Sequence, residues 1–374
     1  MRMLHTADWQ IGMRAVHAGE RAAEVREARL RAAERVVDEA NRRGVDLLLL
    51  AGDTFEDNAV DPVLIRRVVD LLARAACPVA VLPGNHDPLG PGSVFRHPAW
   101  SEAAPRVRVL ASTEPVEIAG ALLLPSPCES KFSTEDPTLR IARAPADRIR
   151  IGVAHGSLRD QGFEVAGDDF PIAAGAAERA GVDYLALGHW HSTLILPSER
   201  AARTAYPGTH EPTKFGERMS GHALEVTLDG PGRAARVEIV ATGTLRWIDR
   251  AATLLGDDDV ARLAAELEAL DAPERALVRL RLDGLLSRAG FDALDRLEET
   301  LRARFLSARV ERQAVAARPE DAAAWAGALP DGVARKVAER LLERAAASDG
   351  DGERRAVALE ALARLVALAR RVQS

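Results

Sequence analysis

The chain has 374 residues, of which 47% are hydrophobic, and this size is typical of two or three globular units. Its formal net charge of -6 argues against a basic module that coats nucleic acid without further help. The two cysteines, Cys77 and Cys128, lie far apart, which argues against a disulfide framework and a thiolate zinc site. No apolar run reaches the roughly 18 residues of a membrane helix, and the first residues do not resemble a signal peptide. We therefore expect a cytoplasmic protein with no membrane partner.

The first part of the chain alternates short apolar runs with amphipathic segments, a pattern typical of βαβ units. We expect strands at 3–6, 45–50 and 78–82 and helices at 20–43 and 62–76. Beyond residue 87 the pattern changes to short strands separated by Gly, Pro and Ser turns, which predicts a second sheet. Its expected elements are strands at 107–110, 116–118, 121–124, 149–154 and 184–187, a helix at 172–180, and a hairpin of 223–228 with 235–240.

The order strand, helix, strand, helix, strand from residue 245 predicts a small α+β module. These elements are expected at 245–248, 257–270, 277–282, 291–305 and 308–313. Two helices rich in Ala, Leu, Arg and Glu follow at 332–346 and 353–372, and their apolar stripes must dock on their own domain or on a partner. We therefore expect three domains, at 1–243, 244–315 and 316–374.

Polar side chains follow five of the apolar runs, each at the point where the predicted strand ends. They are Asp8, Asp53, Asn85, His155 and the pair His189 and His191. Taken singly, a histidine after a strand is more often a core residue, and an aspartate after glycine is more often a turn residue. Because ligands of α/β proteins bind at the carboxyl edge of the sheet, the repetition predicts that these side chains meet in one site.

Two carboxylates, one amide oxygen and three imidazoles suit Mn²⁺, Fe²⁺ or Zn²⁺ better than Mg²⁺ or Ca²⁺. These six ligands are more than one tetrahedral ion binds, whereas two ions that share a carboxylate would bind all six. We choose Asp53 as the shared carboxylate. His86, beside Asn85, is then free to protonate the departing oxygen as a general acid. The predicted reaction is hydrolysis of a phosphoester.

Five segments of the sequence resemble the signature motifs of the calcineurin-like metallophosphoesterases. They are Asp8-Trp9-Gln10, Gly52-Asp53, Gly84-Asn85-His86-Asp87, His155-Gly156 and Gly188-His189-Trp190-His191. Segments 4–9, 52–55 and 206–209, with the module that follows, are similar to SbcD-type DNA repair exonucleases. The resemblance covers about residues 1–315. It implies an α/β fold, a four-layer α/β/β/α sandwich with a small α+β capping domain and a helical C-terminal tail.

The resemblance also implies a ligand set for two Mn²⁺ ions. The first ion would be held by Asp8, Asp53 and His191 with residue 10, the second by Asp53, Asn85, His155 and His189, and His86 would be the catalytic histidine. The family usually has histidine where this chain has Gln10. Gln10 would either ligate the first ion through its amide oxygen, a weaker donor, or hold a metal-bound water.

The function that the resemblance implies is a metal-dependent DNA exonuclease and endonuclease, acting at DNA ends in double-strand break repair. It further implies a homodimer joined through helices of the nuclease domain, and a tail that binds an SbcC-like coiled-coil ATPase. Two alternatives stay open. One is a phosphodiesterase or phosphatase of the same fold that acts on small substrates, and the other is a DNA-end scaffold that Gln10 has left catalytically weak.

Overall fold

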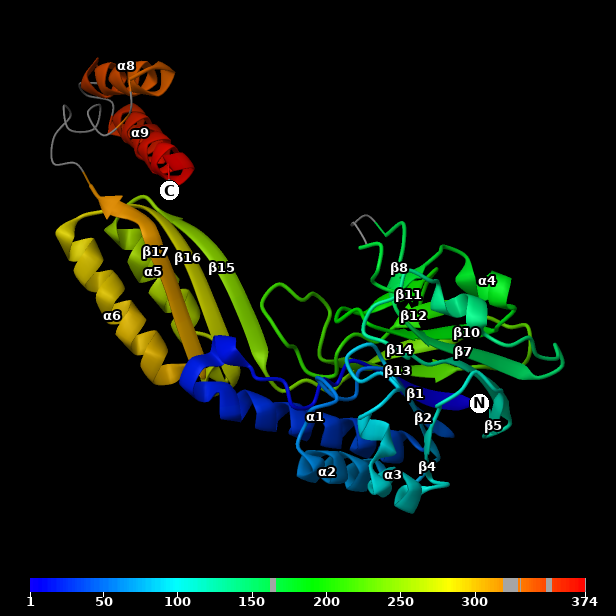
Figure 1. Ribbon diagram of the computed structural model, residues 1–374. Coiled ribbons are helices and arrows are strands. Elements are labelled where there is room, and N and C mark those ends of the chain that lie inside the picture. The colour runs from blue at the N-terminus through cyan, green and yellow to red at the C-terminus, as the bar shows by residue number, and fades with distance from the viewer. Residues whose placement is uncertain (162–165, 319–328, 330, 348–351, 374) are drawn as a thin grey trace. The chain divides into compact units, whose positions relative to one another are not determined.

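The computed structural model describes residues 1–161, 166–318, 329, 331–347 and 352–373, with the backbone alone at 352, 356, 367 and 370–373 (Figure 1). The chain divides into two compact units, Met1–Leu245 and Arg246–Ser374. The predicted further boundary at residue 315 stays a prediction. No helix in the described ranges combines the length and the apolar character that crossing a bilayer requires.

The first unit contains two six-stranded sheets. The order of the first sheet is β14 (Arg236–Ala241), β13 (His222–Thr227), β1 (Arg2–Thr6), β2 (Leu47–Ala51), β3 (Val79–Leu82) and β4 (Val107–Val109). Strands β1 to β4 are parallel, and the hairpin of β13 and β14 adds antiparallel to β1. The prediction that 107–110 belongs to the second sheet is wrong, because β4 pairs with β3. The short helix α3 (Pro98–Ala103) lies between the two strands in the sequence and brings the chain back beside β3, where β4 forms.

The order of the second sheet is β11 (Leu194–Leu196), β12 (Thr204–Tyr206), β10 (Tyr184–Gly188), β7 (Ile149–His155), β6 (Ala121–Ser126) and β5 (Val116–Ile118). Strands β6, β7, β10 and β12 run parallel, and the outer strands are antiparallel to their neighbours. A small ribbon of β8 (Ser157–Leu158) and β9 (Pro171–Ile172) lies apart from both sheets. The predicted helix at 172–180 is accordingly shorter, since only α4 (Ala176–Ala180) is helical.

Helices cover the outer faces of the two sheets, and Figure 1 shows α1 (Ala22–Arg43), α2 (Pro62–Leu72) and α3 on one side with α4 on the other. The run Leu47 to Leu50 explains the layering. Leu48 and Leu50 pack in the cluster under α1 and α2, while Leu47 and Leu49 pack in the cluster between the sheets. Alternate residues of a strand point to opposite faces, so a strand buried on both faces reads as an unbroken apolar run. The predicted α/β/β/α sandwich is confirmed.

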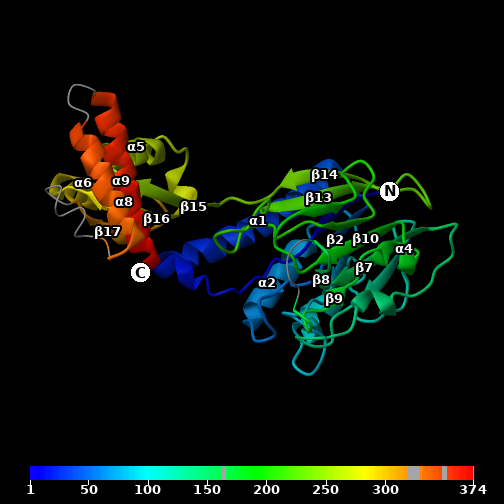
Figure 2. The same ribbon diagram turned by 90° about the horizontal axis from the view of Figure 1, so that it is seen from above.

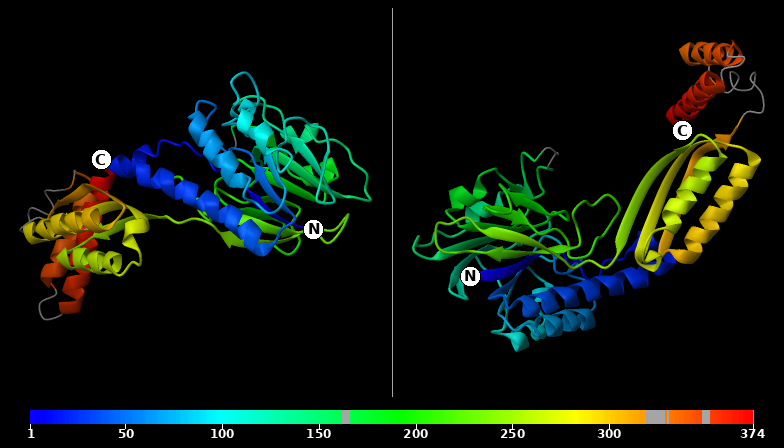
Figure 3. Two further views of the ribbon diagram at one scale, coloured as in Figure 1. Left: turned by 90° about the horizontal axis from the view of Figure 1, so that it is seen from below. Right: turned by 180° about the vertical axis from the view of Figure 1, so that it is seen from behind.

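The second unit contains a parallel three-stranded sheet of β15 (Arg246–Leu254), β16 (Ala276–Leu286) and β17 (Ser307–Ala317). Its connecting helices, α5 (Asp257–Glu268) and α6 (Arg288–Arg304), lie together on one face (Figure 3, right). Two further helices, α8 (Val333–Ala347) and α9 (Gly352–Gln373), lie side by side (Figure 2). Leu362 and Val366 of α9 pack against Leu285 of β16, so the tail docks on its own unit.

Candidate metal centre

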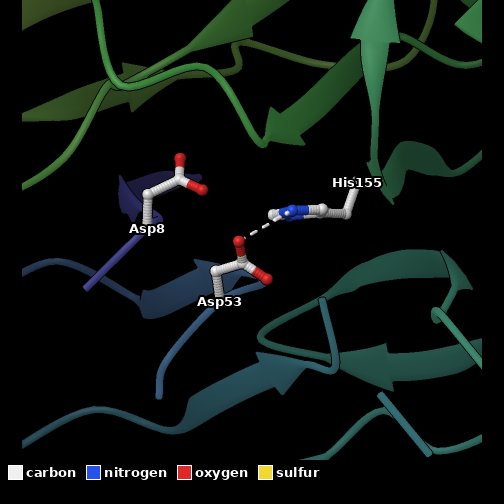
Figure 4. A group of neighbouring side chains, drawn as sticks. All are labelled: Asp8, Asp53 and His155. Atoms are coloured by element: carbon white, nitrogen blue, oxygen red, sulfur yellow. Dashed lines mark ion pairs between the residues drawn. The ribbon is translucent and has the colours of Figure 1, made fainter. Parts of the chain in front are cut away.

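The polar residues at the strand ends meet at one edge of the sandwich. Asp8, Asp53 and Asn85 follow the parallel neighbours β1, β2 and β3, and His155 ends β7. Ligand atoms of Asp8, Asp53 and His155 all lie within 4.8 Å of one another, and all three residues are buried. Figure 4 shows the Asp53 carboxylate pointing toward the His155 ring, with Asp8 beside them.

Two glycines leave the space that the side chains of Asp53 and His155 occupy in the site. A Cβ atom at Gly84 would lie 2.1 Å from Oδ1 of Asp53, and one at Gly52 would lie 2.1 Å from Nδ1 of His155. Both distances are shorter than any tolerated contact, so a side chain at either position would displace a site residue. The glycine before Asp53 and the glycine before Asn85 are therefore required by space, and Gly52 also has a φ of +98°.

Several site residues have backbone conformations that are unfavourable for residues other than glycine. The φ angles are +54° at Asp8, +42° at Gln10, +52° at Asp53 and +111° at His189. Such conformations cost about 1–3 kcal/mol each and concentrate at functional sites. Hydrogen bonds hold them here, since the Asp8 N–H donates to the Gly52 carbonyl (3.1 Å) and the Gln10 N–H to the Asp53 carbonyl (2.9 Å).

The imidazole of His155 is surrounded by oxygen acceptors. Its Nδ1 lies 2.9 Å from the Ala51 carbonyl, and its Nε2 lies 2.9 Å from Oδ1 of Asn85 and 3.3 Å from Oδ2 of Asp53. Burial alone would lower the pKa of His155, but the negative charges of Asp53 and Asp8 raise it to about 9. A protonated ring therefore supplies positive charge at the point where two carboxylates converge.

The side-chain oxygen of Asn85 joins two of the predicted histidine ligands. Oδ1 lies 2.9 Å from Nε2 of His155 and 3.1 Å from Nδ1 of His189. The amide nitrogen donates to the carbonyl of Lys131 (3.4 Å), which fixes the orientation of the amide group. Asp53, Asn85, His155 and His189 thus direct donor atoms toward one another.

Each of the two histidines after β10 is held by a carboxylate. Nε2 of His189 lies 3.0 Å from Asp169, and Nδ1 of His191 lies 2.7 Å from Glu217. In a neutral ring, a nitrogen that donates to a carboxylate leaves the other nitrogen with its lone pair, which is the usual arrangement of a metal-ligating histidine. Nδ1 of His189 and Nε2 of His191 are therefore the donors that remain. His191 acts electrostatically on Asp8, as His155 and His189 also do.

His86 is oriented differently from the other histidines. Its backbone N–H donates to Oδ1 of Asp53 (2.9 Å), and its ring Nδ1 lies 2.9 Å from the carbonyl of Glu56. A carbonyl can only accept, so Nδ1 carries a proton and Nε2 is the nitrogen left for chemistry. The residue as a whole is half-buried.

Asp87 fixes the loop that carries Asn85 and His86. Its carboxylate accepts from the N–H groups of Gly84 (2.8 Å) and Phe55 (3.0 Å), and so ties the third site loop to the second. Burial, together with the negative charge of Asp53, raises the pKa of Asp87 to about 7. The residue shapes the site without belonging to the predicted ligand set.

A buried guanidinium supports the loop that carries Asp8. Arg29 of α1 donates to the carbonyls of Asp8 (3.3 Å), Trp9 and Glu211 (2.6 Å), and to Oγ1 of Thr209 (3.2 Å). Sequence reasoning assigned no role to Arg29, Glu217 or Asp169. The sequence does contain a signal that Arg29 is buried, because this arginine, four residues after Val25, interrupts the apolar stripe of the helix.

The donor set fits divalent metal ions. Two buried carboxylates, an oriented amide oxygen and three histidines with anchored rings supply oxygen and nitrogen ligands of the kind that first-row transition metals prefer. The charge also fits, since in the structure a protonated His155 offsets the carboxylates. Whether Gln10, which is buried in the same loop, takes part stays a prediction.

Known proteins resemble part of this chain. The uncharacterized metallophosphoesterase YhaO of Bacillus subtilis (strain 168) is 28% identical over 196 residues, covering 50% of this chain and 46% of that protein. One component of the nuclease SbcCD of the same organism, SbcD, is 27% identical over 277 residues, covering 61% and 66%. The DNA double-strand break repair protein Mre11 of Methanopyrus kandleri is 27% identical over 239 residues, covering 58% and 50%. The chain thus spans about half to two thirds of the length of these relatives.

A solved structure, TT1561 of Thermus thermophilus, is 15% identical with a TM-score of 0.41, and the match covers 64% of this chain and 98% of that one. The family model described as calcineurin-like phosphoesterase matches residues 1–193, a range that contains every predicted site residue. Members of this family are phosphoester hydrolases that use divalent metals. With more than half of its length matched, the chain belongs to the calcineurin-like phosphoesterase family.

Proposed function

We propose that this protein is a Mn²⁺-dependent DNA nuclease that hydrolyses phosphodiester bonds at DNA ends during double-strand break repair. The proposed hydrolysis is supported by the convergence of Asp8, Asp53 and His155. Asn85 and His189 are directed at the same point. The choice of DNA is supported by the likeness to SbcD of the SbcCD nuclease and to Mre11. The first of these matches covers more of the chain than the family model does.

Under this proposal two ions occupy the site. Asp8, Asp53 and His191, with Gln10, hold the first, and Asp53, Asn85, His155 and His189 hold the second. Such ions polarise the phosphate and lower the pKa of the attacking water. The contacts of His86 suit it to protonate the leaving oxygen, because its Nδ1 is committed to the Glu56 carbonyl and its Nε2 is not.

Cleavage of linear duplex DNA in Mn²⁺ by the parental protein and by Asp53→Asn tests this proposal. We expect the parental protein to degrade the DNA and the variant to be inactive. Asp70→Asn, which changes an exposed aspartate of α2, is the matched control and should cut like the parent. Absence of cleavage by the parental protein, with Mn²⁺ bound, would refute the DNA nuclease assignment.

The same preparation separates the two alternatives. A phosphodiesterase for small substrates would hydrolyse bis(p-nitrophenyl) phosphate in Mn²⁺ and leave DNA intact. A scaffold would bind DNA ends and hydrolyse neither substrate. The likeness to SbcD and Mre11 supports the choice of DNA over a small substrate.

Two partners complete the proposal, an SbcC-like ATPase and a second copy of the chain. The tail exposes apolar residues that its own unit does not cover, among them Val357 and Leu368 of α9. We expect Val357→Glu with Leu368→Glu to weaken capture of the ATPase, whereas Arg364→Ala on the same helix should not. Capture at full strength by the double variant would contradict this surface. Sedimentation equilibrium tests the dimer, and a monomer at micromolar concentration would contradict it.

A further inference from the structure

Lysine is rare in this chain, and twice it precedes phenylalanine. Lys131, Lys214 and Lys336 are the only lysines among 50 basic residues, and the first two are followed by Phe132 and Phe215. Both Lys-Phe pairs belong to loops that contact predicted metal ligands. The third lysine lies on α8 in the second unit.

The first pair lies beside Asn85. The carbonyl of Lys131 accepts from the side-chain amide of Asn85 (3.4 Å), so this loop is fixed to a predicted ligand. Both side chains of the pair are exposed, and the ring of Phe132 is 62% exposed, which is unusual for a large apolar side chain. Nζ of Lys131 lies 5.9 Å from the ring centroid, so a cation and an aromatic face are presented together.

The second pair lies beside His191. Thr213, which precedes Lys214, has its Oγ1 3.0 Å from Nδ1 of His191, and its N–H donates to Glu217 (2.8 Å). Lys214 is exposed at a pocket of about 470 Å³. Its lining includes His189, Trp190, His191, Ser192, Lys214 and Phe215. A volume of this size is in the range of small-ligand sites.

The composition of the two pairs matches one class of ligand. Proteins that bind single-stranded nucleic acid combine cations along the phosphate backbone with aromatic rings on which bases stack. The metal centre itself has acidic residues, among them Asp8, Asp53, Asp169 and Glu217, which repel phosphate in the absence of ions. Lysines in the surrounding loops therefore add positive charge to that of the protonated His155.

We propose that the two Lys-Phe pairs bind a single nucleic-acid strand across the metal centre, one beside Asn85 and the other beside His191. Each lysine contacts a phosphate that flanks the scissile bond, and each phenylalanine stacks on a flanking base. The substrate class is a strand with at least one nucleotide on each side of the bond that is cut. The identity of the cut bond rests on the proposed function, whereas the binding of the strand can be measured without cleavage.

Binding of a fluorescein-labelled ten-residue oligothymidylate, followed by anisotropy in EDTA over a series of salt concentrations, tests the inference. Neither cleavage nor a metal bridge contributes under these conditions. For Lys131→Gln with Lys214→Gln we expect weaker binding and a salt dependence reduced by about 0.7 in log–log slope for each lysine. Phe132→Ala should weaken binding about 5- to 150-fold, as loss of one stacked base does, and Phe132→Tyr should restore it.

Matched controls are Lys336→Gln for charge and Leu139→Ala for an exposed apolar side chain, and both should bind like the parent. The inference is overturned if the parental protein does not bind the strand, or if the lysine pair and Phe132 can be replaced without effect. It is also overturned if Lys336→Gln weakens binding as much as the double variant. Binding that depends on the Lys-Phe pairs, without cleavage in Mn²⁺, would support the inference and refute the nuclease proposal.

Discussion

The carboxylate of Glu217 lies 2.7 Å from Nδ1 of His191, and its side chain is only 4% exposed. Although burial works against it, the hydrogen bond from His191 lowers the pKa of Glu217, so the carboxylate is ionised and Nδ1 carries the proton. Nε2 of His191 is therefore the ring nitrogen that is left to bind a metal. Glu217 acts through His191, as a positioning residue.

Glu217→Gln should weaken binding of the first ion about 10- to 100-fold, because the amide no longer fixes the tautomer of His191. The second ion should bind as before. Titration of the metal-free protein with Mn²⁺ in a calorimeter resolves the two events. Glu178→Gln, an exposed change on α4, is the control. Equal affinities in parent and Glu217→Gln would assign Glu217 to folding alone.

His86→Ala separates chemistry from metal binding. The variant should keep both ions, because His86 contributes only its backbone N–H to Asp53, and should lose roughly 10²- to 10⁴-fold in turnover. Elemental analysis gives the metal content, and steady-state cleavage gives the turnover. Loss of an ion from the variant would make His86 a ligand instead.

Metal affinity should rise with pH toward about 9. In the metal-free protein burial alone would lower the pKa of His155, yet Asp53 and Asp8 raise it to about 9, so at neutral pH an incoming ion must displace a proton from Nε2. As pH rises toward that pKa the proton is already lost and the competition disappears. Calorimetry at pH 7 in buffers of different ionisation enthalpy should therefore show proton release. Binding without release would indicate that His155 is neutral or is not a ligand.

Gln10→His should raise the affinity of the first ion, since imidazole is a better donor than an amide for first-row transition metals. The parental protein should accordingly bind Mn²⁺ in two separate steps, and the variant in steps that are closer together. Calorimetric titration of both proteins distinguishes the cases. Two equally tight ions in the parent, unchanged by the substitution, would show that position 10 does not control the first ion.

The strand ends that carry the candidate site were predictable because both faces of their strands are buried. Leu47 to Leu50 contributes side chains to two cores, so its apolar run is unbroken, and Gly52 and Asp53 follow where the strand ends. Strand β12 was not predicted, because Thr204–Tyr206 is short and owes its structure to pairing with β10 and β11. Tertiary pairing decides such short segments, and sequence periodicity does not reveal it.

The residues that hold the ligands in place were less predictable than the ligands. Glu217 reaches His191 from 26 residues away, and Asp169 reaches His189 from 20 residues away, both out of loops without periodicity. Nothing local in the sequence distinguishes these carboxylates from exposed ones. The need for glycine at positions 52 and 84 was equally unpredictable, because in each case it arises from a side chain on another loop.

The number of Mn²⁺ ions bound by Asp53→Ala, measured by elemental analysis alongside cleavage of linear duplex DNA, tests the shared-carboxylate centre most directly. Asp53 is buried, contacts His155 and receives the His86 N–H, so both ions are expected to depend on it. We predict two ions and active cleavage in the parent, with loss of both ions and of cleavage in the variant. A variant that still binds two ions, or that cuts DNA at close to the parental rate, would contradict the two-metal centre.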